Sequence, residues 1–268
     1  MRPCILCDAP ADILIYGMGE KPIVELARRI ADGFAIGDIR DIPQTVFLAD
    51  DVTPQEGDIV LHSHEECLRN KRSQAENFRH IEEQSNMMHA QRLLQPLKSA
   101  TTPNGYPSGT CVVVNPPYPP MTTAELDASF DLPYTRVPHI KYKDKRIPAY
   151  DMIKFSINIH RGCFGGCAFC TISAHQGKFM SCRSKESVLR EVKQVMQMPD
   201  FKGYPSDLGG PSANMYGMHG RNLNACEKCK RPSCIHPQIC PNLNTDHSKL
   251  LEIYRAVDAL PGIKKSLI

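Results

Sequence analysis

A run of prolines divides this chain of 268 residues into two parts. Seven of its 22 prolines fall between residues 116 and 148, and each proline fixes φ and lacks the backbone N–H that helices and sheets use. Such a density excludes long helices and central strands. Residues 116–150 are therefore predicted to form a proline-rich, extended connector between an N-terminal domain at 1–115 and a second unit at 151–268.

The N-terminal segment alternates between the patterns of strands and helices. Residues 12–17 are a short apolar run typical of a buried strand, and residues 22–33 have the apolar spacing of a helix that ends at a glycine. Further elements are predicted as strands at 45–48, 58–62 and 111–114 and a helix-rich segment at 73–97. The pattern indicates an α/β domain. Because more strand–helix units would be expected before residue 12, we interpret residues 1–115 as the C-terminal part of a larger domain.

The second unit has the order strand, loop, helix, strand, loop, helix, strand. Ser184 is a suitable N-cap for a helix at 184–198, whose aliphatic residues recur on one face. The other elements are predicted as strands at 155–160, 203–208 and 263–268 and a helix at 248–260. This alternation predicts parallel strands that are joined by crossover helices.

Twelve cysteines are a high number for a chain of this length. The chain has neither an apolar run of about 18 residues, which a transmembrane helix needs, nor the apolar start of a signal peptide, so we expect it in the cytoplasm. Disulfides rarely persist there, and clustered cysteines then indicate metal or redox sites. The net charge of +3 gives no reason to expect nucleic acid or a membrane as a partner.

The strongest motif is a group that we call the cysteine triad, Cys163, Cys167 and Cys170. Three thiolates within eight residues, with two glycines between the first two, suit a loop that wraps an iron–sulfur cluster. A 4Fe–4S cluster normally takes four cysteines, so three leave one iron open to another ligand. The alternative is a zinc ion with His160 or His175 as its fourth ligand.

The cysteine triad follows the first strand of the second unit and has an aromatic residue, Phe169, before its last cysteine. In these features it resembles the radical S-adenosylmethionine enzymes. Nearly the whole chain is similar to the YgiQ family of this class, as an internal piece of a longer protein. The similar stretches are Ser63–Glu66, Val112–Pro120, Ile159–Cys170, His175–Phe179, Asp207–Tyr216 and Cys240–Ser248.

The resemblance implies a fold and a reaction. The fold is an N-terminal α/β portion and then the first part of a parallel radical-SAM (β/α) barrel at 151–268. This barrel would be incomplete at the C-terminus, since a whole one takes about 250 residues, and would carry a cysteine-rich insertion at 211–247.

The reaction that the resemblance implies is reductive cleavage of S-adenosylmethionine to a 5′-deoxyadenosyl radical, with a flavodoxin- or ferredoxin-like electron donor and an unknown substrate. We expect little turnover from this piece alone. The alternative is a non-catalytic scaffold that binds zinc or iron–sulfur.

The same resemblance implies roles for individual residues. The cysteine triad would hold the 4Fe–4S cluster, and Phe169 would lie near the adenine of S-adenosylmethionine. Gly209 and Gly210 would receive the cofactor's amino group on exposed backbone, so a bulky residue at Gly210 is expected to weaken cofactor binding and spare the cluster. Pro211 departs from the family pattern, which usually has Glu there. A tight turn that closes a strand is the simpler interpretation of the two glycines.

A second group of cysteines lies further along the chain. This second cysteine group comprises Cys226, Cys229, Cys234 and Cys240, and prolines are interleaved with it. The prolines exclude a helix through the whole group. An auxiliary iron–sulfur cluster or a zinc ion would order such a loop. The alternative is a set of reduced thiols in a flexible insertion.

Overall fold

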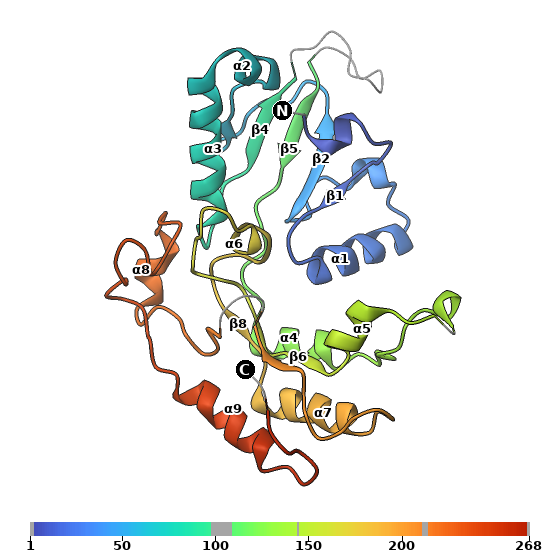
Figure 1. Ribbon diagram of the computed structural model, residues 1–268. Helices are drawn as coiled ribbons and strands as arrows, with labels where there is room; N and C mark the ends of the chain where they lie inside the picture. The colour runs from blue at the N-terminus through green and yellow to red at the C-terminus, as the bar shows by residue number, and fades with distance from the viewer. Residues whose placement is uncertain (1–2, 98–108, 144, 211–213, 267–268) are drawn as a thin grey trace.

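The computed structural model describes residues 3–97, 109–143, 145–210 and 214–266. Its N-terminal part is built on a five-stranded mixed sheet with the strand order β1-β2-β5-β4-β3 (Figure 1). The strands are β1 (Leu14–Ile15), β2 (Thr45–Ala49), β3 (Ile59–Val60), β4 (Leu93–Pro96) and β5 (Cys111–Val114). Neighbouring strands pair in antiparallel fashion, except that β3 and β4 are parallel.

Alternating side chains of the central strands give this sheet an apolar layer on each face. Val46 and Val112 pack with Leu6 on one face, while Phe47 and Val113 belong to a separate buried cluster. The flanking helical segments are η1 (Ile5–Cys7), α1 (Glu20–Ala31), η2 (Ile36–Asp38), α2 (His64–Arg69) and α3 (Lys71–Ser85). In Figure 1, α1 lies on the β1 side of the sheet and α3 on the β4 side.

The predicted elements of this part are confirmed with one correction. The helix expected at 22–33 is α1, and the four expected strands are β1, β2, β3 and β5, of which β1 is partly buried. The segment expected to be helix-rich at 73–97 is helical only to Ser85, and its end forms strand β4. Leu94 there is buried opposite Val113 of β5. Residues 93–96 form a strand because they pair with a strand that is distant in sequence. The spacing of apolar residues along the chain does not reveal such pairing.

The proline-rich segment is not extended throughout. It holds helix α4 (Thr123–Phe130), the short helical turn η3 (Ile140–Tyr142) and the start of α5 (Pro148–Ile153). Residues 121–132 contain no proline, which leaves room for two helical turns. Thr122 and Glu125 close a capping box at the start of α4, and Leu126 is fully buried. The expectation of an extended connector is therefore wrong between Pro120 and Pro133.

The C-terminal part contains a parallel strand pair with a helix between its strands. Strands β6 (Ser156–Asn158) and β9 (Asp207–Gly209) pair in parallel, with Ile157 opposite Leu208. The other elements are β7 (His160–Arg161), α6 (Ile172–Gln176), β8 (Ser181–Cys182), α7 (Lys185–Met196), α8 (Leu223–Glu227) and α9 (Ser248–Asp258). The expected parallel pairing is thus confirmed for two strands, and the barrel stays a prediction.

Helix α7 covers the parallel pair as the sequence predicted. The Ser184 hydroxyl accepts a hydrogen bond from Ser187 N (3.1 Å) at its start. Val188, Val192 and Val195 are buried in one core with Ile157, Leu208 and residues of α9. No helix in the described part of the chain is both long enough and apolar enough to span a membrane.

Two strand predictions in this part need correction. The strand expected at 203–208 begins only at Asp207, because Gly203 has a φ of +93° and Pro205 lacks an N–H donor. The strand expected at 263–268 is not formed over its described residues, 263–266. Lys264 N donates to Gly203 O (2.8 Å), but among the described residues no neighbouring strand continues this bond into a ladder. Residues 267–268 lie outside the described part.

A buried ion pair ties strand β8 to helix α7. The side chain of Arg183 is fully buried and pairs with Glu191. Its guanidinium also donates to Ser187 Oγ (2.8 Å) and to the carbonyl oxygen of Asn158 (2.9 Å). Arg136 pairs with the other carboxylate oxygen of Glu191. One carboxylate on helix α7 therefore balances two guanidinium groups.

We expect Glu191→Gln to lower the free energy of unfolding by about 3 kcal/mol, because it leaves Arg183 and Arg136 without their counter-charge in the interior. The matched control is Glu252→Gln, which removes the exposed partner of Lys185 and should have a small effect. Urea denaturation curves of both variants measure the difference. Equal midpoints for the two variants would contradict this role of Glu191.

Candidate metal and cofactor site

The cysteine triad lies in the loop between β7 and α6. Cys163 is buried, Cys170 is partly buried and Cys167 is exposed. Cys163 N donates to Gly177 O (3.0 Å), and Cys170 N donates to Cys167 O (3.0 Å). The first bond fastens the start of the loop to the end of α6, and the second closes a tight turn. The backbone of the triad is thus held at both ends.

Two of the three thiols converge on the space beside Gly165. A Cβ atom added to this glycine would lie 3.3 Å from the Sγ of Cys163 and 3.7 Å from the Sγ of Cys167. Any side chain at Gly165 would enter the space between these two sulfurs. Among the described residues, no three His, Cys, Asp or Glu side chains are grouped so that they could hold a metal ion. The structure thus brings together two of the predicted ligands and leaves Cys170 apart.

Gly166 permits close contact between the two cysteine-bearing loops. Its φ is +60°, and an added Cβ would lie 2.3 Å from the carbonyl oxygen of Pro232. Cys234 N also donates to Phe164 O (3.0 Å). Cys234 and Cys240 pack against an apolar cluster that includes Cys163 and Phe164. The second cysteine group therefore rests directly on the triad loop, although the sequence separates the two groups by more than fifty residues.

The triad loop carries the type of ligand that an iron–sulfur cluster uses. Its donor set is three thiols, and Gly165 keeps the space between two of them free of a side chain. Phe169, the residue expected near the adenine of a cofactor, is 90 % exposed on the same loop. Its ring is accessible to a ligand, and its contact with adenine stays a prediction.

The Gly209–Gly210 turn lies at the end of the parallel strand β9. Gly209 O accepts from Ile159 N (2.9 Å), and Gly210 N donates to Asn214 Oδ1 (3.1 Å). An added Cβ at Gly210 would lie 1.9 Å from His160 Nε2. The missing side chain of Gly210 therefore makes room for a buried histidine. Binding of the cofactor's amino group here stays a prediction, and Pro211, the departure from the family pattern, lies outside the described residues.

His160 is a site residue that the sequence interpretation considered only as a zinc ligand. It is fully buried and precedes the triad by three residues. Its Nε2 accepts a hydrogen bond from Met215 N (3.2 Å), which lies beyond the Gly209–Gly210 turn. The ring thus links the strand that carries the triad to the turn after β9. In the sequence, only its position just before the triad indicated that His160 could belong to the site. That position did not indicate that Gly210 is its neighbour.

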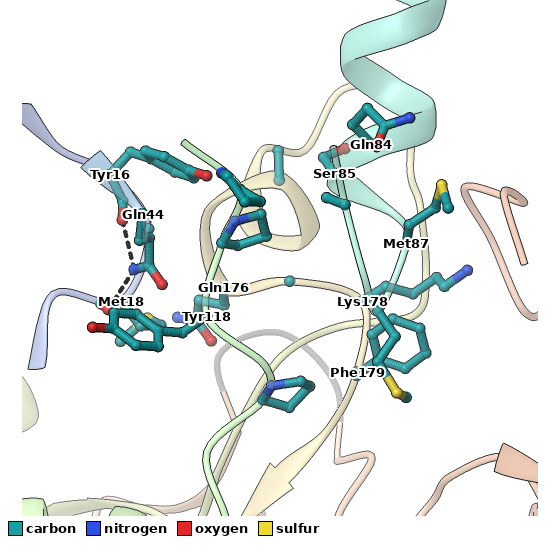
Figure 2. A pocket seen from close by; sticks show the side chains of 18 of the residues that line it. Tyr16, Met18, Gln44, Gln84, Ser85, Met87, Tyr118, Gln176, Lys178 and Phe179 are labelled. Atoms are coloured by element: carbon teal, nitrogen blue, oxygen red, sulfur yellow. Dashed lines mark hydrogen bonds between the residues drawn. The ribbon is translucent and has the colours of Figure 1, made fainter. Parts of the chain in front are cut away.

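A pocket of about 420 Å³ borders the segment after the triad, residues 174–181. Figure 2 shows Tyr16, Met18 and Gln44 on one side of it and Gln84, Met87 and Phe179 on the other. Gln44 Nε2 donates to the carbonyl oxygens of Tyr16 (2.6 Å) and Met18 (2.5 Å), which fixes the wall beside α1. Burial raises the pKa of the Tyr16 hydroxyl, which donates to Asn115 O (2.6 Å). The sequence interpretation did not identify this pocket, because its walls come from distant segments.

Comparison with known proteins gives the family of the chain. Residues 1–156 match the family described as Radical SAM N-terminal. The whole chain aligns with a UPF0313 protein of Bacteroides thetaiotaomicron at 63 % identity and with one of Porphyromonas gingivalis at 57 %, and it covers 44 % and 41 % of their lengths. A UPF0313 protein of Methanocella arvoryzae is 42 % identical over the whole chain, which covers 43 % of it.

The chain thus spans less than half the length of these curated relatives. The family match covers more than half of its residues, and it agrees with the resemblance found in the cysteine triad and its surroundings. This chain belongs to the Radical SAM N-terminal family.

Proposed function

We propose that this chain is part of a radical S-adenosylmethionine enzyme and binds a 4Fe–4S cluster through Cys163, Cys167 and Cys170. The observation that carries the proposal is the convergence of the Cys163 and Cys167 sulfurs on the space beside Gly165. The loop that holds them comes shortly after the parallel strand β6 and directly after β7, which pairs antiparallel with β8; a ligand loop in a barrel would likewise follow a parallel strand. Membership of the Radical SAM N-terminal family supports the same class of chemistry.

Cys163, Cys167 and Cys170 would hold the cluster and leave one iron open to the amino and carboxylate groups of S-adenosylmethionine. When bound, the cluster and the cofactor would supply the cleavage of one carbon–sulfur bond of S-adenosylmethionine to methionine and a 5′-deoxyadenosyl radical, with one electron from a flavodoxin- or ferredoxin-like donor. The residues of this chain would bind and orient the cluster and the cofactor. Gly165 keeps the ligand space open, and His160 packs the triad strand against the Gly209–Gly210 turn. Exposed Phe169 offers its ring face to the adenine. The substrate depends on the whole protein, and we assign none.

Electron paramagnetic resonance tests the proposal. The chain is reconstituted anaerobically with iron and sulfide, reduced with dithionite, and measured with and without S-adenosylmethionine. We expect a 4Fe–4S signal that changes when S-adenosylmethionine is added, because the cofactor binds the open iron. In a full-length protein of the family, the same mixture should release 5′-deoxyadenosine and methionine.

Two outcomes would overturn this function. Zinc without iron in the triad would favour the non-catalytic metal-binding scaffold. A reducible cluster in the full-length protein that never yields 5′-deoxyadenosine would exclude radical formation. Loss of the signal in a chain that fails to fold is recognised by circular dichroism on the same sample.

A further inference from the structure

The second cysteine group is folded into two closed turns. Cys229 N donates to Cys226 O (3.1 Å), and Cys240 N donates to Cys234 O (2.8 Å). All four cysteines are partly buried. A Cys-x-x-Cys turn such as Cys226–Cys229 is a common way in which a loop presents two thiolates to one metal. Cys234 and Cys240 pack beside the triad loop, to which the bond from Cys234 N to Phe164 O holds them.

A buried lysine stands beside this group. Lys178 is only 3 % exposed, and its ammonium donates to Cys229 Sγ (3.6 Å) and to Arg231 O (2.8 Å). In the described part of the chain, no carboxylate pairs with it. A buried ammonium without an anion is costly. Thiolates on a metal would supply the missing negative charge, since four of them around a divalent ion leave a net charge of about −2.

A second polar side chain also faces the group. Asn242 Nδ2 donates to Cys226 Sγ (3.3 Å) and to Asn222 O (2.8 Å). Gly220 leaves room for this thiol, because an added Cβ would lie 2.3 Å from Cys226 Sγ. Sulfur that accepts N–H bonds from fixed partners is the usual surrounding of a metal-bound thiolate. Lys178 and Asn242 thus occupy the positions of residues that orient ligands.

We infer that Cys226, Cys229, Cys234 and Cys240 are the thiolate ligands of a second metal centre, either one zinc ion or an auxiliary iron–sulfur cluster. Neither cysteine group of the described chain has three side chains already grouped to hold a metal ion. Metal binding would therefore require the four thiols to move closer together, which couples it to the folding of this loop. This centre would fix the loop on the cysteine triad, and it does not depend on the proposed radical chemistry.

The test uses a chain in which the cysteine triad is replaced by alanine, so that any bound metal belongs to the second cysteine group. We expect elemental analysis to find about one zinc, or about four irons with acid-labile sulfide. Replacement of the four cysteines of the group by serine should remove that metal. Cys4→Ser is the control, since this thiol lies far along the chain in the N-terminal part. Visible absorbance distinguishes the two metals, because zinc is colourless.

A second measurement keeps the inference testable if the serine variant does not fold. In the unsubstituted chain, maleimide labelling and peptide mapping report on each thiol separately. The four thiols should be protected until a chelator is added, while Cys4 reacts throughout. Lys178→Met should weaken metal retention against the chelator by about 10-fold, and Lys185→Met, at an exposed lysine, should not. Free labelling of all four thiols, together with a metal-free triad variant, would overturn the inference.

Discussion

Replacement of Cys163, Cys167 and Cys170 together by alanine is expected to remove about four irons from each anaerobically reconstituted chain, because one cluster is lost. The S-adenosylmethionine-dependent resonance signal should disappear with them. The single variant Cys167→Ala, at an exposed and therefore accessible ligand, should abolish 5′-deoxyadenosine release in the full-length protein. Iron analysis and chromatography of the nucleoside measure these effects.

Cys111→Ala is the matched control for the triad variants. Cys111 is buried in the N-terminal sheet, and burial raises the pKa of its thiol to about 11, so it is neutral and a poor ligand at neutral pH. This variant should keep its iron and its signal. Unchanged iron in the triple triad variant would exclude the triad as the cluster site.

Gly210→Val is expected to destabilise the C-terminal part by about 3 kcal/mol or more, because overpacking of a rigid core is costly. An added Cβ at Gly210 would lie 1.9 Å from His160 Nε2, and His160 is fully buried. The expectation from sequence, that a bulky residue here weakens cofactor binding and spares the cluster, stays a prediction, and this clash adds a loss of stability to it. The strand that carries the triad would itself be displaced. Urea denaturation followed by circular dichroism measures the loss.

Two further variants separate this clash from a general effect of losing a glycine. Gly37→Val replaces an exposed glycine with no atom near its added Cβ, and it should leave stability nearly unchanged. Gly210→Ala combined with His160→Ala should recover part of the stability that Gly210→Ala alone loses, since the clashing ring is gone. A stable Gly210→Val chain would show that the turn adopts another course.

The elements that could be predicted from sequence are those whose own residues specify them. Helix α7 carries its cap and its buried valines within thirteen residues, so its spacing sufficed. Strand β4 could not be predicted, because it becomes a strand by pairing with β5. Helix α4 was not predicted because prolines surround it in the sequence, although a capping box at Thr122 marks its start. Local signals identified local structure, and long-range pairing decided the rest.

The candidate site likewise has features that the sequence predicts and features that only the fold reveals. The cysteine triad is contiguous in sequence, so its spacing alone indicated a cluster. The contacts that shape it are not contiguous: Gly210 makes room for His160, and Gly166 faces the carbonyl oxygen of Pro232. Lys178 was part of a family-like stretch with no assigned role, and only the fold places it against Cys229. A glycine in a motif indicates that space is needed but not which residue needs it.

The pocket in Figure 2 has walls from both parts of the chain, since Tyr16 and Gln44 face the segment that follows the triad. A molecule that fills it must touch the N-terminal sheet and the cysteine-bearing part at once. Its binding free energy then adds to the interactions that hold the two parts together. Occupancy of the pocket and the docking of the two parts are therefore thermodynamically linked, and each strengthens the other by the same amount.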